Sequence, residues 1–228
     1  MKKIILPFIF ALAVSAPVAA QKAPAKATTA AAKSQLTAQT VIDNYLVALG
    51  GKAKLEAVKT TITDNTMSVQ GMELSMTTKK MGNKFKSVQS VMGQEMSQVF
   101  DGEKGVINQM GNKMDIPAET LPELKKGKTI HALGYDAASF TTVASEQVEG
   151  KAYNVLTSEK GKFFFDASTG LLYKSETNQG SAIVKSYLTV DGIKFPELIE
   201  AEGNGQKISI KTTKVTINSG VTDEDFKI

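Results

Sequence analysis

The sequence predicts a mainly β domain with a few helices, in which one curved antiparallel sheet of ten or eleven strands does not close. From residue 60 onward, turn residues such as Gln70–Gly71 and Asp101–Gly102 recur about every ten positions, and the runs between them partly alternate apolar and polar residues. This spacing is typical of successive β-hairpins. Since so many strands rarely form a small open sheet without curling, we expect an incompletely closed barrel with helices on its concave side.

The N-terminus has the three-part pattern of a secretory signal. Lys2 and Lys3 are followed by an apolar run over residues 4–14, and small residues end at Ala20. The apolar run is too short to span a bilayer. We therefore expect residues 1–20 to be a signal peptide that is cleaved near Ala20, and the mature protein to be periplasmic in a Gram-negative-type envelope.

Residues 21–36 differ in composition from the rest of the chain. They consist mainly of alanine, lysine and threonine, with Leu36 as the one large apolar residue. Such a segment buries too little apolar surface to fold, which predicts a flexible linker. The remaining residues, 37–228, are enough for one sizeable core, so we expect a single β domain there.

The charge and cysteine content exclude several classes of protein. All 27 basic residues are lysines, and the net charge of +4 becomes −1 from Thr37 onward. Because arginine supplies the planar fork that binds phosphate groups in two places, its absence argues against nucleic-acid binding. The chain has no cysteine, so it can form neither a disulfide nor a lipidated N-terminal cysteine. Length and charge favour a monomer.

Helical segments interrupt the strand pattern at two places. Thr37 or Thr40 can cap a first helix that Gly50–Gly51 ends, and a short second helical turn is expected over residues 52–58. A further short helix is expected after Pro117. The first helix presents one apolar face: Val41, Ile42, Tyr45, Leu46 and Leu49.

No constellation of residues for catalysis is present. His131 is the single histidine, whereas a zinc site or a Ser-His-Asp triad needs further partners, and no G-x-S-x-G, H-E-x-x-H or phosphate-loop motif occurs. We expect His131 to be an ordinary surface or partly buried histidine, and the acidic run 223–225 to form a solvated turn. The sequence thus predicts no enzyme, no catalytic residue, no metal ligand and no cofactor.

The methionines are unevenly distributed, since eight of nine lie between residues 67 and 114. Methionine is flexible and polarizable, so a methionine-lined wall can repack around apolar ligands; the same residues could equally be core filler. A third interpretation is a Cu(I) site, because thioether sulfurs on one strand face select that ion. Three pairs spaced four residues apart carry it: Met72/Met76, Met92/Met96 and Met110/Met114.

Three segments resemble the outer-membrane lipoprotein-sorting proteins of the LolA/LolB-like superfamily: DGIKFPELIEAEGNG (191–205), FFFDASTGLLYKSET (163–177) and KVTINSGVTDEDF (214–226). The chain is more closely similar to Bacteroidetes envelope proteins with this domain, where residues 41–60 and 76–85 also have counterparts. The resemblance implies an unclosed half-barrel of about eleven strands around helices, with an apolar cavity for acyl chains. Two departures, the missing arginine of the sorting chaperone's cavity and the missing cysteine of its lipoprotein receptor, argue against lipoprotein transfer as such.

These observations predict a non-enzymatic periplasmic carrier for a hydrophobic ligand, either a lipid, an acyl chain or a lipoprotein, with transient membrane contact. Ile42 and Leu46 are expected to gate or plug the cavity. A structural or interaction module with a self-filled cavity, and a methionine-based Cu(I)-handling protein, are the alternatives. The expected cavity-lining residues are Met67, Val69, Leu74, Met76, Val88, Met92, Met96, Val99 and Phe164.

Overall fold

The computed structural model describes residues 32–33, 35–91, 94–109 and 111–228. The predicted signal peptide and the linker up to residue 31 lie outside these ranges. The described chain forms fourteen strands in a single antiparallel sheet. In chain order they are β1 (Ala32–Lys33), β2 (Thr60–Val69), β3 (Met72–Met81), β4 (Lys84–Val91), β5 (Gln94–Phe100), β6 (Gly105–Gln109), β7 (Asn112–Asp115), β8 (Phe140–Val148), β9 (Lys151–Ser158), β10 (Gly161–Asp166), β11 (Leu172–Thr177), β12 (Gly180–Val190), β13 (Ile193–Gly203) and β14 (Gln206–Ile217).

The helices lie at three places along the chain: before β2, between β7 and β8, and after β14. Two α-helices precede β2, and the connection from β7 to β8 holds a third. They are α1 (Ala38–Leu49), α2 (Lys52–Ala57) and α3 (Leu121–Lys125), with the 3₁₀-helices η1 (Ala118–Thr120), η2 (His131–Gly134), η3 (Ala137–Ser139) and η4 (Asp223–Phe226).

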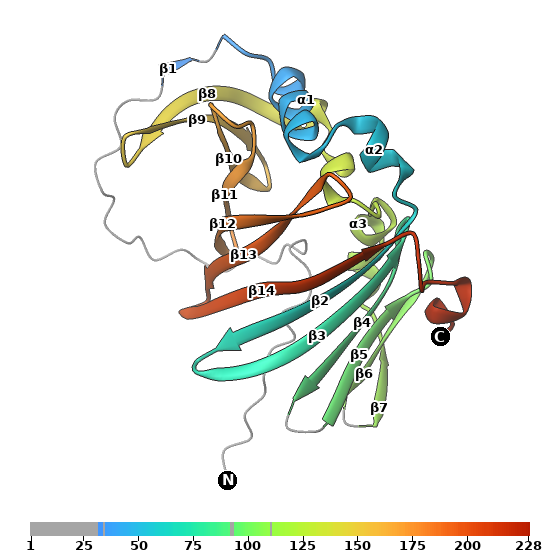
Figure 1. The fold of residues 1–228 in the computed structure, drawn as a ribbon. Helices are drawn as coiled ribbons and strands as arrows, with labels where there is room; N and C mark the ends of the chain where they lie inside the picture. Colours follow the sequence, from blue (N-terminus) through green and yellow to red (C-terminus); the bar gives the residue numbers. More distant parts are fainter. Residues whose placement is uncertain (1–31, 34, 92–93, 110) are drawn as a thin grey trace.

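The sheet is curved and open. Its strand order is β1-β8-β9-β10-β11-β12-β13-β14-β2-β3-β4-β5-β6-β7, so β1 and β7 are the two free edges. Figure 1 shows the sheet curling around the side on which the α-helices lie. The predicted class, an unclosed half-barrel, is confirmed. The strand count exceeds the expected eleven, and two of the additional strands are β1 and β7. β1 falls within the predicted linker range, and β7 is exposed along its whole length, so it carries no alternation of burial.

The first helix forms where its sequence predicts it. Thr37 caps it, since its side-chain oxygen accepts a hydrogen bond from the Thr40 amide at 3.1 Å. Gly50 ends it with a φ of 131°, and a Cβ placed there would lie 2.5 Å from the Gly192 carbonyl oxygen. Glycine is therefore required at the contact between the end of α1 and the β12–β13 turn.

The largest core cluster joins α1 and α2 to the sheet. Leu55 of α2 and Leu156 of β9 have no exposed surface, and Tyr45 of α1 packs edge-on against Phe165 of β10 with 5.2 Å between ring centroids. The α1 face predicted from helical spacing is buried here. The buried members of this cluster are Val41, Ile42, Tyr45, Leu46, Leu49, Leu55, Val58, Ile130, Ala132, Leu156, Phe165 and Ile193.

One row of paired residues identifies the face of the sheet that carries the helices. Directly paired residues in an antiparallel sheet share a face, and Leu156 belongs to the helix-covered cluster. We call this the inner face and the opposite side the outer face. The row runs without interruption from β9 to β3 through Leu156, Phe163, Ser175, Ala182, Ala201, Ile208, Val69 and Met72.

The C-terminal helix η4 docks beside β4 on the outer face (Figure 1). Phe226 is buried against Val99 and Val106. Lys79 and Lys84 hold the turn through ion pairs of 2.6 Å to Asp225 and Asp223 respectively. The acidic run was expected to be a solvated turn, and Asp223 and Glu224 are indeed exposed in a 3₁₀ turn. The structure adds that Asp225 is partly buried and that Phe226 beside it packs into a small outer core.

Candidate ligand-binding face

The inner face of β2, β3 and β14 carries an apolar wall that is separate from the helix-covered core. Met67 and Val69 pair directly with Leu74 and Met72 of β3 on one side, and with Ile210 and Ile208 of β14 on the other. Alternation along a strand places these side chains on one face. The cluster consists of Met67, Val69, Leu74 and Ile208, with Met76 and Ile210 packed against it.

Five of the nine residues expected to line a cavity share the inner face. Met67, Val69, Leu74 and Met76 lie in or against the apolar wall. Met96 of β5 pairs with Gln89, which pairs with Met76, so it faces the same way. Met92 lies outside the described residues.

The remaining three expected cavity residues lie on the outer face. Val88 pairs with Thr77, and Val99 packs against Phe226 in the outer core. Phe164 points away from its neighbours Phe163 and Phe165, and packs with Tyr153 and Val155 in another outer cluster. Their placement corrects the expectation of a shared wall. Alternation tells which residues of one strand share a face, but it does not tell which face of the sheet they share with residues of the next strand. The run of three phenylalanines at 163–165 has no alternation of apolar and polar residues that would indicate which of them faces inward.

The two residues expected to gate or plug the cavity are core residues of α1. Ile42 and Leu46 are 3% and 7% exposed and belong to the helix-covered cluster. Their helix thus covers the inner face over the β9–β13 half of the sheet, and leaves the apolar wall of β2, β3 and β14 in a cluster of its own.

The other described methionines are divided between the two faces. Met72 is on the inner face, Met81 packs in the outer core, and Met114 is 48% exposed. The Met67 sulfur accepts a hydrogen bond from the Gln89 amide at 3.8 Å. Met110 lies outside the described residues. Among those that are described, no group of three or more His, Cys, Asp or Glu side chains is placed to hold a metal ion.

The inner face becomes polar toward the other end of the same strands. Thr78 of β3 and Ser87 of β4 pair with each other, and their hydroxyl groups form a hydrogen bond of 2.5 Å. Gln98 of β5 pairs with Ser87, and its side-chain oxygen is buried with no hydrogen-bond partner among the described residues. Lys80 lies one step further along β3, where it pairs with Phe85. This polar end was not predicted from the sequence, because two adjacent lysines give no sign that one of them faces inward. Neighbouring residues on a strand face opposite sides of the sheet.

The connection from β7 to β8, residues 116–139, crosses at this polar end. The Thr129 hydroxyl accepts a hydrogen bond of 2.7 Å from the Gly82 amide, just beyond β3. Glu123 forms an ion pair of 2.5 Å with Lys160 in the β9–β10 turn. The connection therefore joins the two halves of the curved sheet and places η2 beside the end of β3.

His131 in η2 lies in the field of two lysines. Burial among the surrounding elements, together with the positive charges of Lys80 and Lys160, lowers the pKa of His131 to about 4. His131 is nevertheless an exposed residue, and its ring contacts Tyr135 edge-on at 5.5 Å. The imidazole is thus uncharged at neutral pH. Burial also raises the pKa of Tyr135.

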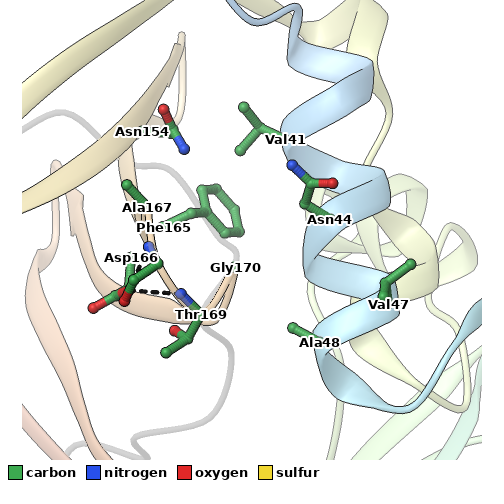
Figure 2. Close-up of a pocket in the computed structure, with 11 residues that line it drawn as sticks. Val41, Asn44, Val47, Ala48, Asn154, Phe165, Asp166, Ala167, Thr169 and Gly170 are labelled. Carbon is green, nitrogen blue, oxygen red and sulfur yellow. Dashed lines mark hydrogen bonds between the residues drawn. The ribbon is translucent and has the colours of Figure 1, made fainter.

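Two hollows lie away from this wall. One, of about 250 Å³, separates α1 from the β10–β11 hairpin, as Figure 2 shows. Its carboxylate, Asp166, accepts hydrogen bonds from the Ser168 and Thr169 amides of its own turn, which lower its pKa. The other, of about 510 Å³, lies near Glu197 and Thr212, where β13 diverges from β14. Neither brings together a set of reactive groups.

Comparisons with known proteins bear on the fold. No family model matches the sequence, and no curated protein does. Among solved structures, a LolA superfamily protein from Nitrosomonas europaea matches 85% of this chain and 98% of its own, with 10% identity and a TM-score of 0.57. An outer membrane lipoprotein-sorting protein domain from Vibrio parahaemolyticus matches 83% of this chain and 97% of its own, with 11% identity and a TM-score of 0.58.

The chain therefore has the fold of the LolA superfamily, as its resemblance implied. At these identities the likeness describes the fold alone, and the closer kinship with Bacteroidetes envelope proteins stays a prediction. No helix within the described ranges is long and apolar enough to cross a membrane.

Proposed function

We propose that the protein is a non-enzymatic periplasmic carrier that holds a hydrophobic ligand, a lipid, an acyl chain or a lipidated protein, against the inner face of its half-barrel. The observation that carries this proposal is the apolar wall of β2, β3 and β14, which forms a cluster apart from the helix-covered core. The LolA-like fold and the N-terminal signal pattern support it.

Apolar burial supplies the binding free energy in this proposal. Each methylene group taken out of water contributes about 0.8 kcal/mol. Met67, Met76 and Met96 on the inner face can change rotamer to fit chains of different shape, because the thioether side chain is flexible. The protein acts as a monomer and contacts the membrane only while it loads or releases its ligand.

A second candidate is an interaction module whose own elements fill the concave side. It is favoured by the coverage of the inner face by α1 and α2 over one half of the sheet. In that case the apolar wall would be a folding core, and partner recognition would fall to exposed residues such as Val47, which is 71% exposed on α1.

Native mass spectrometry of the protein purified from the periplasm without detergent distinguishes the two. The carrier predicts added mass that matches a fatty acid, a phospholipid or an acylated peptide. An unliganded mass that stays unchanged after incubation with lipid vesicles would exclude the carrier and leave the interaction module. Added mass of copper would instead support the methionine-based alternative.

A further inference from the structure

The inner face of β3 changes from apolar to charged along its length. Its inward residues alternate with outward ones, and they read, from the apolar wall toward η2, Met72, Leu74, Met76, Thr78 and Lys80. The neighbouring strand β2 repeats the gradient, with Val69 and Met67 at the apolar end and Thr63 and Thr61 toward the other. On β4 and β5 the inward residues are Ser87 and Gln98 beside Thr78, and then Phe85 and Phe100 in the row of Lys80. A ligand lying along these strands thus meets different chemistry at its two ends.

Lys80 is the cation at the polar end, and it has no ion-pair partner in the part of the chain that the structure describes. Its neighbour Lys79 faces outward and forms an ion pair with Asp225, whereas no ion pair or hydrogen bond of the Lys80 side chain is found among the described residues. The charges acting on nearby His131 are those of Lys80 and Lys160, both positive.

An unpaired interior cation lowers the stability of the protein. Burial lowers the pKa of Lys80, which means that the surroundings disfavour its charged form. An anion brought beside it would recover that free energy, because opposite charges in a poorly solvated site attract strongly. The Gln98 oxygen, which likewise has no hydrogen-bond partner within the described ranges, indicates that the same region is built to meet polar groups.

We propose that the ligand is an acidic amphiphile, whose carboxylate or phosphate head lies against Lys80 beside η2 and whose chain runs along β3 toward Leu74. This inference rests on the proposed carrier function and specifies the class and the orientation of its ligand. Lys80 binds the head as a point charge, and the uncharged His131 ring borders it.

The length of the strand suits such a ligand. Lys80 and Leu74 are six residues apart on β3, which corresponds to about 20 Å at a rise of about 3.4 Å per residue. One acyl chain of a bilayer leaflet spans about 15 Å, half of the hydrocarbon core. A head at Lys80 therefore places the end of the chain between Met76 and Leu74.

The test compares a charged and an uncharged acyl probe. Binding of cis-parinaric acid and of its methyl ester is measured by fluorescence for the wild type, Lys80→Gln, Lys80→Arg and the control Lys151→Gln, which removes an exposed lysine at the start of β9. We expect Lys80→Gln to weaken binding of the acid about 10-fold, which corresponds to 1.4 kcal/mol, and to leave the ester unaffected. Lys80→Arg should retain the affinity for the acid, and Lys151→Gln should behave as the wild type.

Competition identifies the source of the anionic head. Displacement of the acid probe by palmitate or by lysophosphatidic acid, but not by hexadecanol, supports the inference and assigns the carboxylate or the phosphate. If both probes bind and Lys80→Gln weakens neither, or weakens both equally, the inference is overturned while the carrier function stands. If neither probe binds the wild type and no lipid mass is found, the carrier function fails as well.

Discussion

At the scale of single residues, the inner face differs from an ordinary core at Gln98. A buried oxygen without a partner lowers the stability of the protein by roughly 1–3 kcal/mol, and Gln98 is 6% exposed. We expect Gln98→Leu, which has nearly the same volume, to raise the free energy of unfolding by about 1 kcal/mol. Urea denaturation measures this change. A loss of stability would mean that the amide contributes an interaction that the buried oxygen does not reveal.

His131 gives a prediction for the pH dependence of stability. The unfolded chain binds a proton on this residue below about pH 6.5, whereas the folded protein does so only below about pH 4. Between these values the unfolded state binds more protons, so the free energy of unfolding falls as the pH decreases. We expect His131→Gln to lose less stability than the wild type between pH 6.5 and pH 4.

The same denaturation series at several pH values provides the control. Carboxylates whose pKa is lowered by ion pairs, such as Asp225 and Glu123, titrate at lower pH and are present in both proteins. The difference between the two stability curves therefore isolates the histidine. Parallel curves over this interval would contradict the lowered pKa of the His131 imidazole.

At the scale of elements, the C-terminal turn η4 is an anchored part of the fold. Phe226 is 2% exposed and closes the outer core over Val99 and Val106. We expect Phe226→Ala to lower the free energy of unfolding by about 3–5 kcal/mol, as is typical for a buried phenylalanine. Thermal denaturation measures the loss, and Ile228→Ala, two residues further on and 44% exposed, is the control. Equal stability of the two variants would show that η4 is dispensable.

The elements also show what residue patterns can and cannot predict. The capping threonine and the terminal glycine located α1, because both act through local backbone geometry. The hairpins were predictable for the same reason, since turns such as Gln70–Gly71 require a positive φ. The faces of separate strands were not, because their orientation depends on register across the sheet. Val88 was thus placed on the wrong face.

The polar end of the candidate site was missed for a related reason. Lys79 and Lys80 are adjacent lysines, and only the alternation of Met72, Leu74 and Met76 along β3 indicates that Lys80 shares their face. Its proximity to His131 depends on the connection from β7 to β8, which is fixed by the contact between Thr129 and Gly82. Contacts of this kind between distant segments leave no local signal in the sequence.

At the scale of the whole molecule, the half-barrel divides its inner face into two parts. The helices lie over the half formed by β9 to β13 (Figure 1). The strands β2, β3 and β14 present the apolar wall, and Lys80 lies on the same face toward the other end of β3. The two halves are joined by the β7–β8 connection through the Glu123–Lys160 ion pair. A ligand bound along β3 would therefore lie on the part of the inner face whose apolar residues do not belong to the helix-covered core.

Photolabelling with a diazirine-bearing fatty acid tests this claim most directly, because it reports which face of the sheet the acyl chain touches. Peptide mapping after irradiation should place the label on inward residues of β2 and β3, such as Met67, Leu74 and Met76. Outward residues of the same sheet, Val88 and Val99, serve as the internal control and should remain unlabelled. Label on the outer face, or label spread evenly over both faces, would contradict a carrier that holds its ligand inside the half-barrel.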